Sequence, residues 1–180
     1  MSRLRFDPVR IRLARDIRNN LSKSLLKSLA AKDRSPFQRC GAAYLQQHLE
    51  PVYAMYVTKR LEKYEEAFNA IEVRGLREVF QQAAEFWDLG LYYEMHELLE
   101  PIWKEADGAR RRALQGLIQA AGMKIHAESN NNKAAASMGS KALAALRKYG
   151  GELEGFSRLE AVLRDLMQNN SSTQETLQDT

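Results

Sequence analysis

Apolar residues recur at intervals of three and four along most of the chain, the spacing of one face of an α-helix. No segment shows the period-two alternation of a half-buried strand, and only 4 prolines and 10 glycines interrupt the pattern. The pattern therefore predicts an all-α fold. We expect a single-domain helical bundle, because short connections favour antiparallel packing of helices that follow one another.

The first predicted helix begins at Asp7 and Pro8, because aspartate is a favoured N-cap and proline is favoured at the first helical position. Its apolar positions follow at steps of four: Leu13, Ile17, Leu21, Leu25 and Leu29. Arginine and lysine occupy much of the remaining surface. Such a basic amphipathic helix can dock on an acidic segment, lie on a membrane or contact phosphates. No nucleic-acid-binding signature accompanies it, which favours docking within the protein.

Prolines, glycines and an asparagine-rich turn separate the further helices. These are predicted over residues 35–50, 52–68, 74–87, 91–104, 109–127, 133–149 and 156–167. The two helices on either side of the turn at residues 106–108 should form a central antiparallel hairpin. We expect residues 1–70 to be an N-terminal helical section that packs on a core domain of residues 71–168. The polar residues 169–180 should be a disordered tail.

The composition is typical of a soluble globular protein, with 180 residues, 44% hydrophobic and 28% charged. No apolar run reaches the roughly 18 residues that a membrane-spanning helix needs. The first ten residues lack the apolar segment of a signal peptide. The single cysteine, Cys40, cannot form an internal disulfide and is typical of a reducing compartment. We therefore expect a cytoplasmic protein of bacterial type.

The net charge of +4 hides a strong segregation of charge along the chain. Residues 1–60 hold 13 basic and 4 acidic side chains, a net +9, and residues 61–107 hold 4 and 12, a net −8. Residues 108–150 hold 8 and 1, a net +7, and residues 151–180 hold 2 and 6, a net −4. Alternating blocks favour attraction between segments within the fold or across a homo-oligomer. A nucleic-acid or anionic-lipid surface on the first block is the alternative.

Polar side chains and a tryptophan lie on the facing sides of the central hairpin, where a core is usually apolar. These candidate binding residues, which we call the polar seam, are His96, Glu97, Glu100, Trp103, Gln115, Gln119 and His126. A buried polar group without a partner costs about 1–3 kcal/mol. The seam residues should therefore satisfy one another or bind a ligand.

The motif HELLE, residues 96–100, is not that of a zinc protease, which needs a second histidine where this chain has Glu100. His96 and Glu100 can still share a metal ion with His126 as a third ligand. If the hairpin folds about Gly108, however, His126 is offset from His96 by about six residues, or roughly 9 Å. A helical di-iron site needs Glu-x-x-His pairs, which neither histidine has.

The sequence favours a binding or structural module in which His96 and Glu100 exchange hydrogen bonds with Gln115 and Gln119. The alternative is a metal-assisted or acid–base enzyme, similar to a hydrolase, that uses His96, Glu100 and His126. The residues do not assign catalytic groups, a metal or a cofactor, and no nucleophile is evident. A small molecule or a protein remains open as the partner.

Two segments, LGLYYEMHELLEPIW and LQGLIQAAGMKIHAESNNNKAAASMGSKALAAL, together resemble a bacterial and archaeal family catalogued as domain of unknown function 309. The resemblance rests on the glycine turn at Gly90, the His-Glu-x-x-Glu motif, Trp103, the segment QGLIQ and the downstream His126. It covers residues 86–146. One departure is the turn Ser129–Asn132, where the family commonly has Gly-Asn. The resemblance implies an all-helical fold and no particular reaction.

Overall fold

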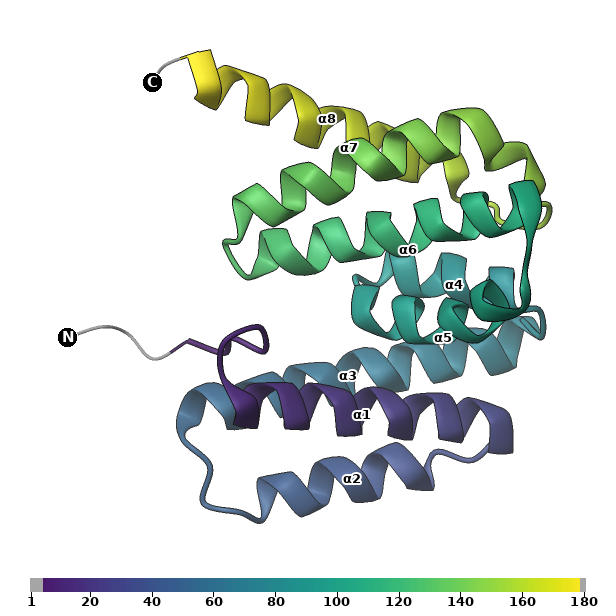
Figure 1. Cartoon of the computed structure of the whole chain (residues 1–180). Helices are drawn as coiled ribbons and strands as arrows, with labels where there is room; N and C mark the ends of the chain where they lie inside the picture. The colour runs from purple at the N-terminus through teal and green to yellow at the C-terminus, as the bar shows by residue number, and fades with distance from the viewer. Residues whose placement is uncertain (1–4, 179–180) are drawn as a thin grey trace. The chain divides into compact units, whose positions relative to one another are not determined.

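The computed structural model describes residues 5–178 of the chain (Figure 1). Within these residues the chain forms eight α-helices and one short 3₁₀ helix, and no strand, which confirms the predicted all-α fold. The chain forms two compact units, and the boundary between them lies between Leu76 and Arg77. The sequence predicted a single domain. Gly75, in the left-handed conformation with φ 64°, ends the last helix of the first unit, so the helical pattern is interrupted there. The predicted packing of an N-terminal section on the core stays a prediction.

The first unit contains three helices, α1 (Arg12–Ala31), α2 (Ser35–Leu45) and α3 (Pro51–Arg74), and each contacts the other two (Figure 1). Their core holds aliphatic and aromatic side chains, all fully or almost fully buried: Ile17, Leu21, Leu25, Phe37, Val57, Tyr64, Phe68 and Ile71. Burial of each such side chain contributes about 1.5–3 kcal/mol to folding. This unit therefore has an apolar core of its own.

Helix α1 begins later than the sequence predicted. The Asp7 carboxylate accepts a hydrogen bond from the backbone N–H of Val9 at 3.0 Å and so caps a separate turn at residues 8–10. The regular helix starts only at Arg12. Leu13 was predicted to be buried, but its exposure is 42% and Ala14 takes the inward position. Steps of four drift around a helix of 3.6 residues per turn, which rotates the first member of the stripe outward.

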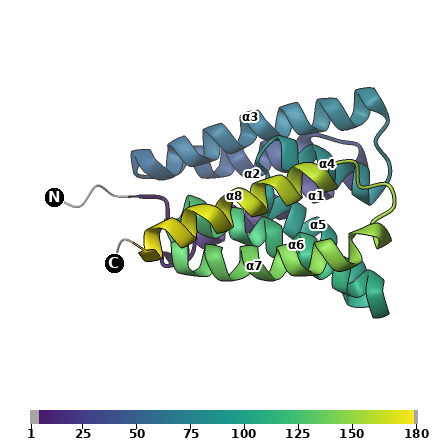
Figure 2. The same ribbon diagram turned by 90° about the horizontal axis from the view of Figure 1, so that it is seen from above.

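The second unit contains the remaining helices, and each of its α-helices packs against the next α-helix in the sequence (Figure 2). They are α4 (Val79–Asp88), α5 (Tyr92–Glu105), α6 (Gly108–Glu128), α7 (Asn132–Tyr149), the 3₁₀ helix η1 (Gly150–Glu152) and α8 (Leu159–Gln178). The predicted hairpin is formed by α5 and α6. Helix α8 was predicted to end near residue 167, but its backbone continues into the polar tail, where Gln, Glu and Leu are good helix formers.

Two features of sequence explain how this unit is arranged around α5 and α6. Gly90 has φ 66°, so it reverses the chain between α4 and α5 as the sequence predicted. Gly116 lies where α6 meets α7, and a Cβ there would come within 2.9 Å of the Leu146 side chain and 3.2 Å of Ala145. A residue without a side chain is therefore required for the two helices to approach this closely.

Among the helices of residues 5–178, none combines the length and the apolar character that crossing a bilayer needs.

Candidate functional site

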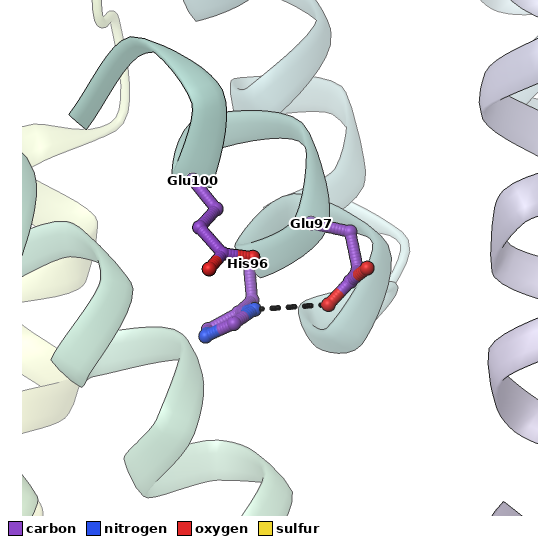
Figure 3. Close-up of side chains that lie close together, drawn as sticks. All are labelled: His96, Glu97 and Glu100. Carbon is purple, nitrogen blue, oxygen red and sulfur yellow. Dashed lines mark ion pairs between the residues drawn. The ribbon is translucent and has the colours of Figure 1, made fainter. Parts of the chain in front are cut away.

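Helix α5 carries three side chains whose ligand atoms cluster on one side of the helix. One atom each of His96, Glu97 and Glu100 can be chosen so that all lie within 4.8 Å of one another (Figure 3). His96 and Glu100 share a face because residues four apart are neighbours on a helix. Glu97 reaches the same region from the adjacent position, and its Oε1 lies 3.4 Å from Nδ1 of His96. One imidazole and two carboxylates therefore converge.

The imidazole of His96 is held in place but not fully satisfied. Its ring stacks on that of Tyr93, with centroids 6.1 Å apart and planes 11° from parallel. Nδ1 is buried and has no hydrogen-bond partner among the described residues, so Glu97 approaches it without hydrogen-bond geometry. The side chains of His96 and Glu97 are 31% and 23% exposed. Both side chains are therefore partly open to solvent, although Nδ1 itself is buried.

Glu100 also faces a cation of the same helix. Nζ of Lys104 lies 2.8 Å from its Oε1, and the two side chains are 62% and 34% exposed. The sequence predicted instead that Glu100 and His96 bond to Gln115 and Gln119. No such bond across the hairpin occurs among the described residues, where His96 lies next to Glu97 and Glu100 pairs with Lys104.

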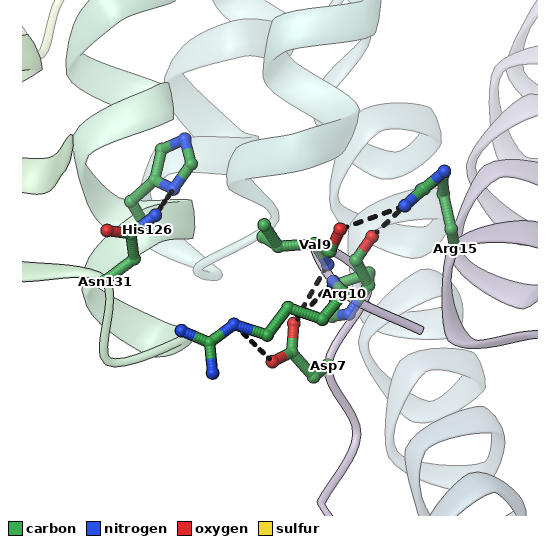
Figure 4. A network of polar contacts seen from close by, with 7 residues as sticks. Asp7, Val9, Arg10, Arg15, His126 and Asn131 are labelled. Atoms are coloured by element: carbon green, nitrogen blue, oxygen red, sulfur yellow. Dashed lines mark hydrogen bonds and ion pairs between the residues drawn. The ribbon is translucent and has the colours of Figure 1, made fainter. Parts of the chain in front are cut away.

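His126 does not belong to the cluster of ligand atoms on α5. It lies near the end of α6, where its Nδ1 is 3.2 Å from Nδ2 of Asn131 (Figure 4). The backbone N–H of Asn131 also donates to the carbonyl of His126 at 2.8 Å. The axial offset expected from the hairpin explains the result, since α6 continues past the start of α5. His126 therefore takes part in the turn between α6 and α7.

Trp103 and Gln115 meet in a second place, a cleft of about 260 Å³. Six residues line it: Trp103, Arg111, Arg112, Gln115, Ala145 and Tyr149. The cleft is formed by α5, α6 and α7. The seam of the sequence prediction is thus divided, with His96, Glu97 and Glu100 in one group and Trp103 with Gln115 in another. Gln119 is half-buried on α6 and joins neither.

Five residues of these two places were not among the predicted site residues: Lys104, Arg111, Arg112, Ala145 and Tyr149. Lys104 could have been found, because a lysine four residues after a glutamate is a helix ion pair. Arg111 could also have been found, because it precedes Gln115 by four residues and so shares its face. Tyr149 could not, because its place in the cleft depends on how α7 lies against α6.

The comparisons with known proteins concern the same part of the chain. Residues 80–138 match the family model described as Domain of unknown function (DUF309). This confirms the resemblance that the sequence suggested. The DUF309 match runs from α4 into α7, about a third of the chain, and contains all seven residues of the polar seam. Neither the curated proteins nor the solved structures gave a match. The DUF309 description names no activity.

Proposed function

We propose that the DUF309 segment is a metal-binding module and that His96, Glu97 and Glu100 bind a divalent transition-metal ion. The observation that carries the proposal is the convergence of one imidazole and two carboxylates within 4.8 Å on α5. A nitrogen and two oxygen donors form a ligand set that suits Zn²⁺ and similar ions. The buried Nδ1 of His96 supports it, because a ligand would remove the cost of an unpaired polar atom.

Metal-assisted hydrolysis is the second function that we consider for the same residues. Three protein ligands leave one position of a tetrahedral ion for water, and a bound Zn²⁺ lowers the pKa of such water to about 7. The partial exposure of all three side chains favours this use, because a substrate could approach the ion. His126 has no part in this version. A cytosolic location belongs to the proposal and is supported by the single cysteine.

Titration of metal-free, untagged protein with Zn²⁺ in a calorimeter tests the proposal. We expect one site per chain, and Co²⁺ should give the visible absorption of a protein-bound ion. His96→Ala and Glu100→Gln should each weaken Zn²⁺ binding about tenfold or more, because each removes one of three ligands. His48→Ala is the matched control, since His48 is an exposed histidine outside the cluster. His126→Ala should also bind normally.

Three results would contradict the proposal. The first is the absence of stoichiometric binding in the unmodified protein. The second is binding that survives in His96→Ala and Glu100→Gln. The third is binding that is lost equally in His48→Ala, which would indicate scattered surface sites.

A further inference from the structure

The cleft between α5, α6 and α7 is lined by two aromatic rings and two guanidinium groups. Trp103 and Tyr149 supply the rings, and Gln115 and Ala145 complete the lining. Arg111 and Arg112 supply two guanidinium groups, and none of the six lining residues is acidic. The cleft lies just below the usual range of about 300–1,000 Å³ for small-molecule sites. Its size therefore suits a single small ligand.

Arg111 is already held in the position that a ligand needs. Its Nη1 donates to the backbone carbonyls of Lys104 and Ala106, at 3.2 Å in each case. The guanidinium carbon lies 4.5 Å from the centroid of the Trp103 ring. Arginine has five N–H donors, and the hydrogen bonds found among the described residues use only Nη1. The remaining N–H groups are fixed in orientation beside the cleft, so little side-chain freedom is lost on binding.

Two cations also lie close to the ring of Tyr149. The guanidinium of Arg112 lies 5.7 Å from the centroid of the Tyr149 ring, and Nζ of Lys148 lies 5.2 Å from it. A hydrogen bond to Lys148, with the nearby charges of Lys148 and Arg112, lowers the pKa of the Tyr149 hydroxyl. The cations that stabilise a negative charge at the phenol oxygen, Lys148 and Arg112, also attract an anion bound beside it.

The backbone of α6 also contributes positive potential at the cleft. Arg111 and Arg112 lie in the first turns of α6, the end at which the helix dipole is positive. Asp107 precedes this helix, but its side chain makes no capping hydrogen bond. Aromatic faces, fixed cations and a positive helix end therefore meet at one cleft.

We propose that this cleft binds a small ligand in which a planar aromatic ring is joined to a phosphate, the chemical class of the nucleoside monophosphates. The ring enters beside Trp103 and Tyr149, where aromatic stacking is favourable. The phosphate lies at the rim toward Arg111 and Arg112, because guanidinium groups bind phosphate oxygens through paired hydrogen bonds. The cleft and the proposed metal site are separate, since no residue of the cleft belongs to the His96 cluster.

Tryptophan fluorescence gives a direct measurement, because the chain has 2 tryptophans and only one lines the cleft. Trp87 is 5% exposed and lies elsewhere in the unit. We expect adenosine monophosphate, added with EDTA present, to change the emission of the full-length protein in a saturable way. Trp103→Phe should remove the change and leave the steady emission of Trp87. Adenosine and inorganic phosphate should each bind more weakly, because each lacks half of the recognised chemistry.

A pair of neighbouring arginines provides the decisive control. Arg112 lines the cleft, whereas the guanidinium of Arg110 lies over Phe80, 5.7 Å from its centroid, and does not. Arg112→Gln should weaken binding of adenosine monophosphate about tenfold, the effect of losing one charged hydrogen bond. Arg110→Gln changes the net charge equally and should bind as the unmodified protein does. Circular dichroism verifies that both variants are folded.

The proposal is overturned if millimolar adenosine monophosphate gives neither a fluorescence change nor heat in a calorimeter. It is also overturned if Arg110→Gln and Arg112→Gln lose affinity equally, which would indicate general attraction by a basic surface. Equal affinity for inorganic phosphate alone would exclude recognition of the ring.

Discussion

Lys104 lies one helical turn after Glu100 on α5, and its Nζ is 2.8 Å from Oε1 of Glu100. An exposed ion pair of this kind contributes about 0.2–1 kcal/mol, so the lysine competes only weakly with a metal ion for the carboxylate. If the metal-binding proposal is correct, Lys104→Gln should therefore raise the affinity for Zn²⁺ about two- to fivefold. Calorimetric titration of the metal-free variant measures the change.

Lys141→Gln is the control for this experiment, because Lys141 is an exposed lysine on α7 and is not paired with the cluster. It should leave the affinity for Zn²⁺ unchanged. An unchanged or lower affinity in Lys104→Gln would show that the Glu100 carboxylate is not a ligand.

The close contact of α6 with α7 leads to a prediction about stability. Gly116→Ala places a Cβ within 2.9 Å of the Leu146 side chain, so the helices or that side chain must shift. Overpacking costs about 1–3 kcal/mol, and the better helix propensity of alanine returns up to about 1 kcal/mol. We expect the free energy of unfolding to fall by about 1–2 kcal/mol, measured by urea denaturation.

Gly151→Ala is the matched substitution, because nothing lies within 4 Å of a Cβ at that position. Its effect should stay within about 0.5 kcal/mol. Equal stability of the two alanine variants would mean that the α6–α7 interface is looser than the structure indicates.

The helices could be predicted because their signals are local. The turn at Gly90 and the apolar spacing placed most helices of both units close to their observed ranges. Exact starts were harder to predict, because the Asp7 carboxylate can cap either a turn or a helix with the same hydrogen bonds. The end of α8 was missed because a polar composition was given more weight than the helix propensity of individual residues.

The candidate site divides in the same way. The sequence alone brings His96, Glu97 and Glu100 together, because they lie within two turns of one helix. Whether residues on different helices meet depends on how far one helix is shifted along the other. The periodicity of the sequence does not determine this shift. Trp103 and Gln115 meet in the cleft, whereas His126 bonds to Asn131 instead of joining the cluster. The contribution of Tyr149 could not be predicted for the same reason.

Two tyrosines should titrate on opposite sides of the ordinary tyrosine pKa of about 10. Lys148 and Arg112 lower the pKa of Tyr149, whereas burial, followed by the nearby carboxylates of Glu128, Asp165 and Asp88, raises the pKa of Tyr92. Ultraviolet absorption of the phenolates measures both. Tyr149→Phe should remove a component that titrates below the ordinary tyrosine pKa, and Tyr92→Phe a component that titrates above it.

The sign of the effect on folding follows from these directions. The lowered pKa of Tyr149 stabilises the folded state at a pH above the tyrosine pKa of the unfolded chain. This stabilisation is lost as the pH falls through the lowered pKa of the folded state. The raised pKa of Tyr92 opposes folding at a pH above the tyrosine pKa of the unfolded chain, because the buried hydroxyl resists ionisation. Relative to that high pH, the folded state is favoured below the unfolded pKa, and this advantage is lost as the pH rises through the raised pKa. If Tyr149→Phe left the early part of the titration intact, the positive potential assigned to the cleft would be wrong.

Asn131 joins the end of α6 to the start of α7 through its side chain. Its Oδ1 accepts from the backbone N–H of Ala134 at 3.4 Å, and its Nδ2 lies 3.2 Å from Nδ1 of His126. Asn131→Ala removes both contacts, so the free energy of unfolding should fall by about 1 kcal/mol, the usual effect of losing an N-cap. Urea denaturation measures the change.

The adjacent Asn132 is exposed and is the first residue of α7, so Asn132→Ala should change the stability by less than about 0.5 kcal/mol. His126→Ala separates the two contacts of Asn131. If the contact between the two side chains contributes, the effects of His126→Ala and Asn131→Ala should not add in the double variant, because they remove the same interaction. Strict additivity would mean that the contact between the His126 and Asn131 side chains contributes nothing to the stability of this turn.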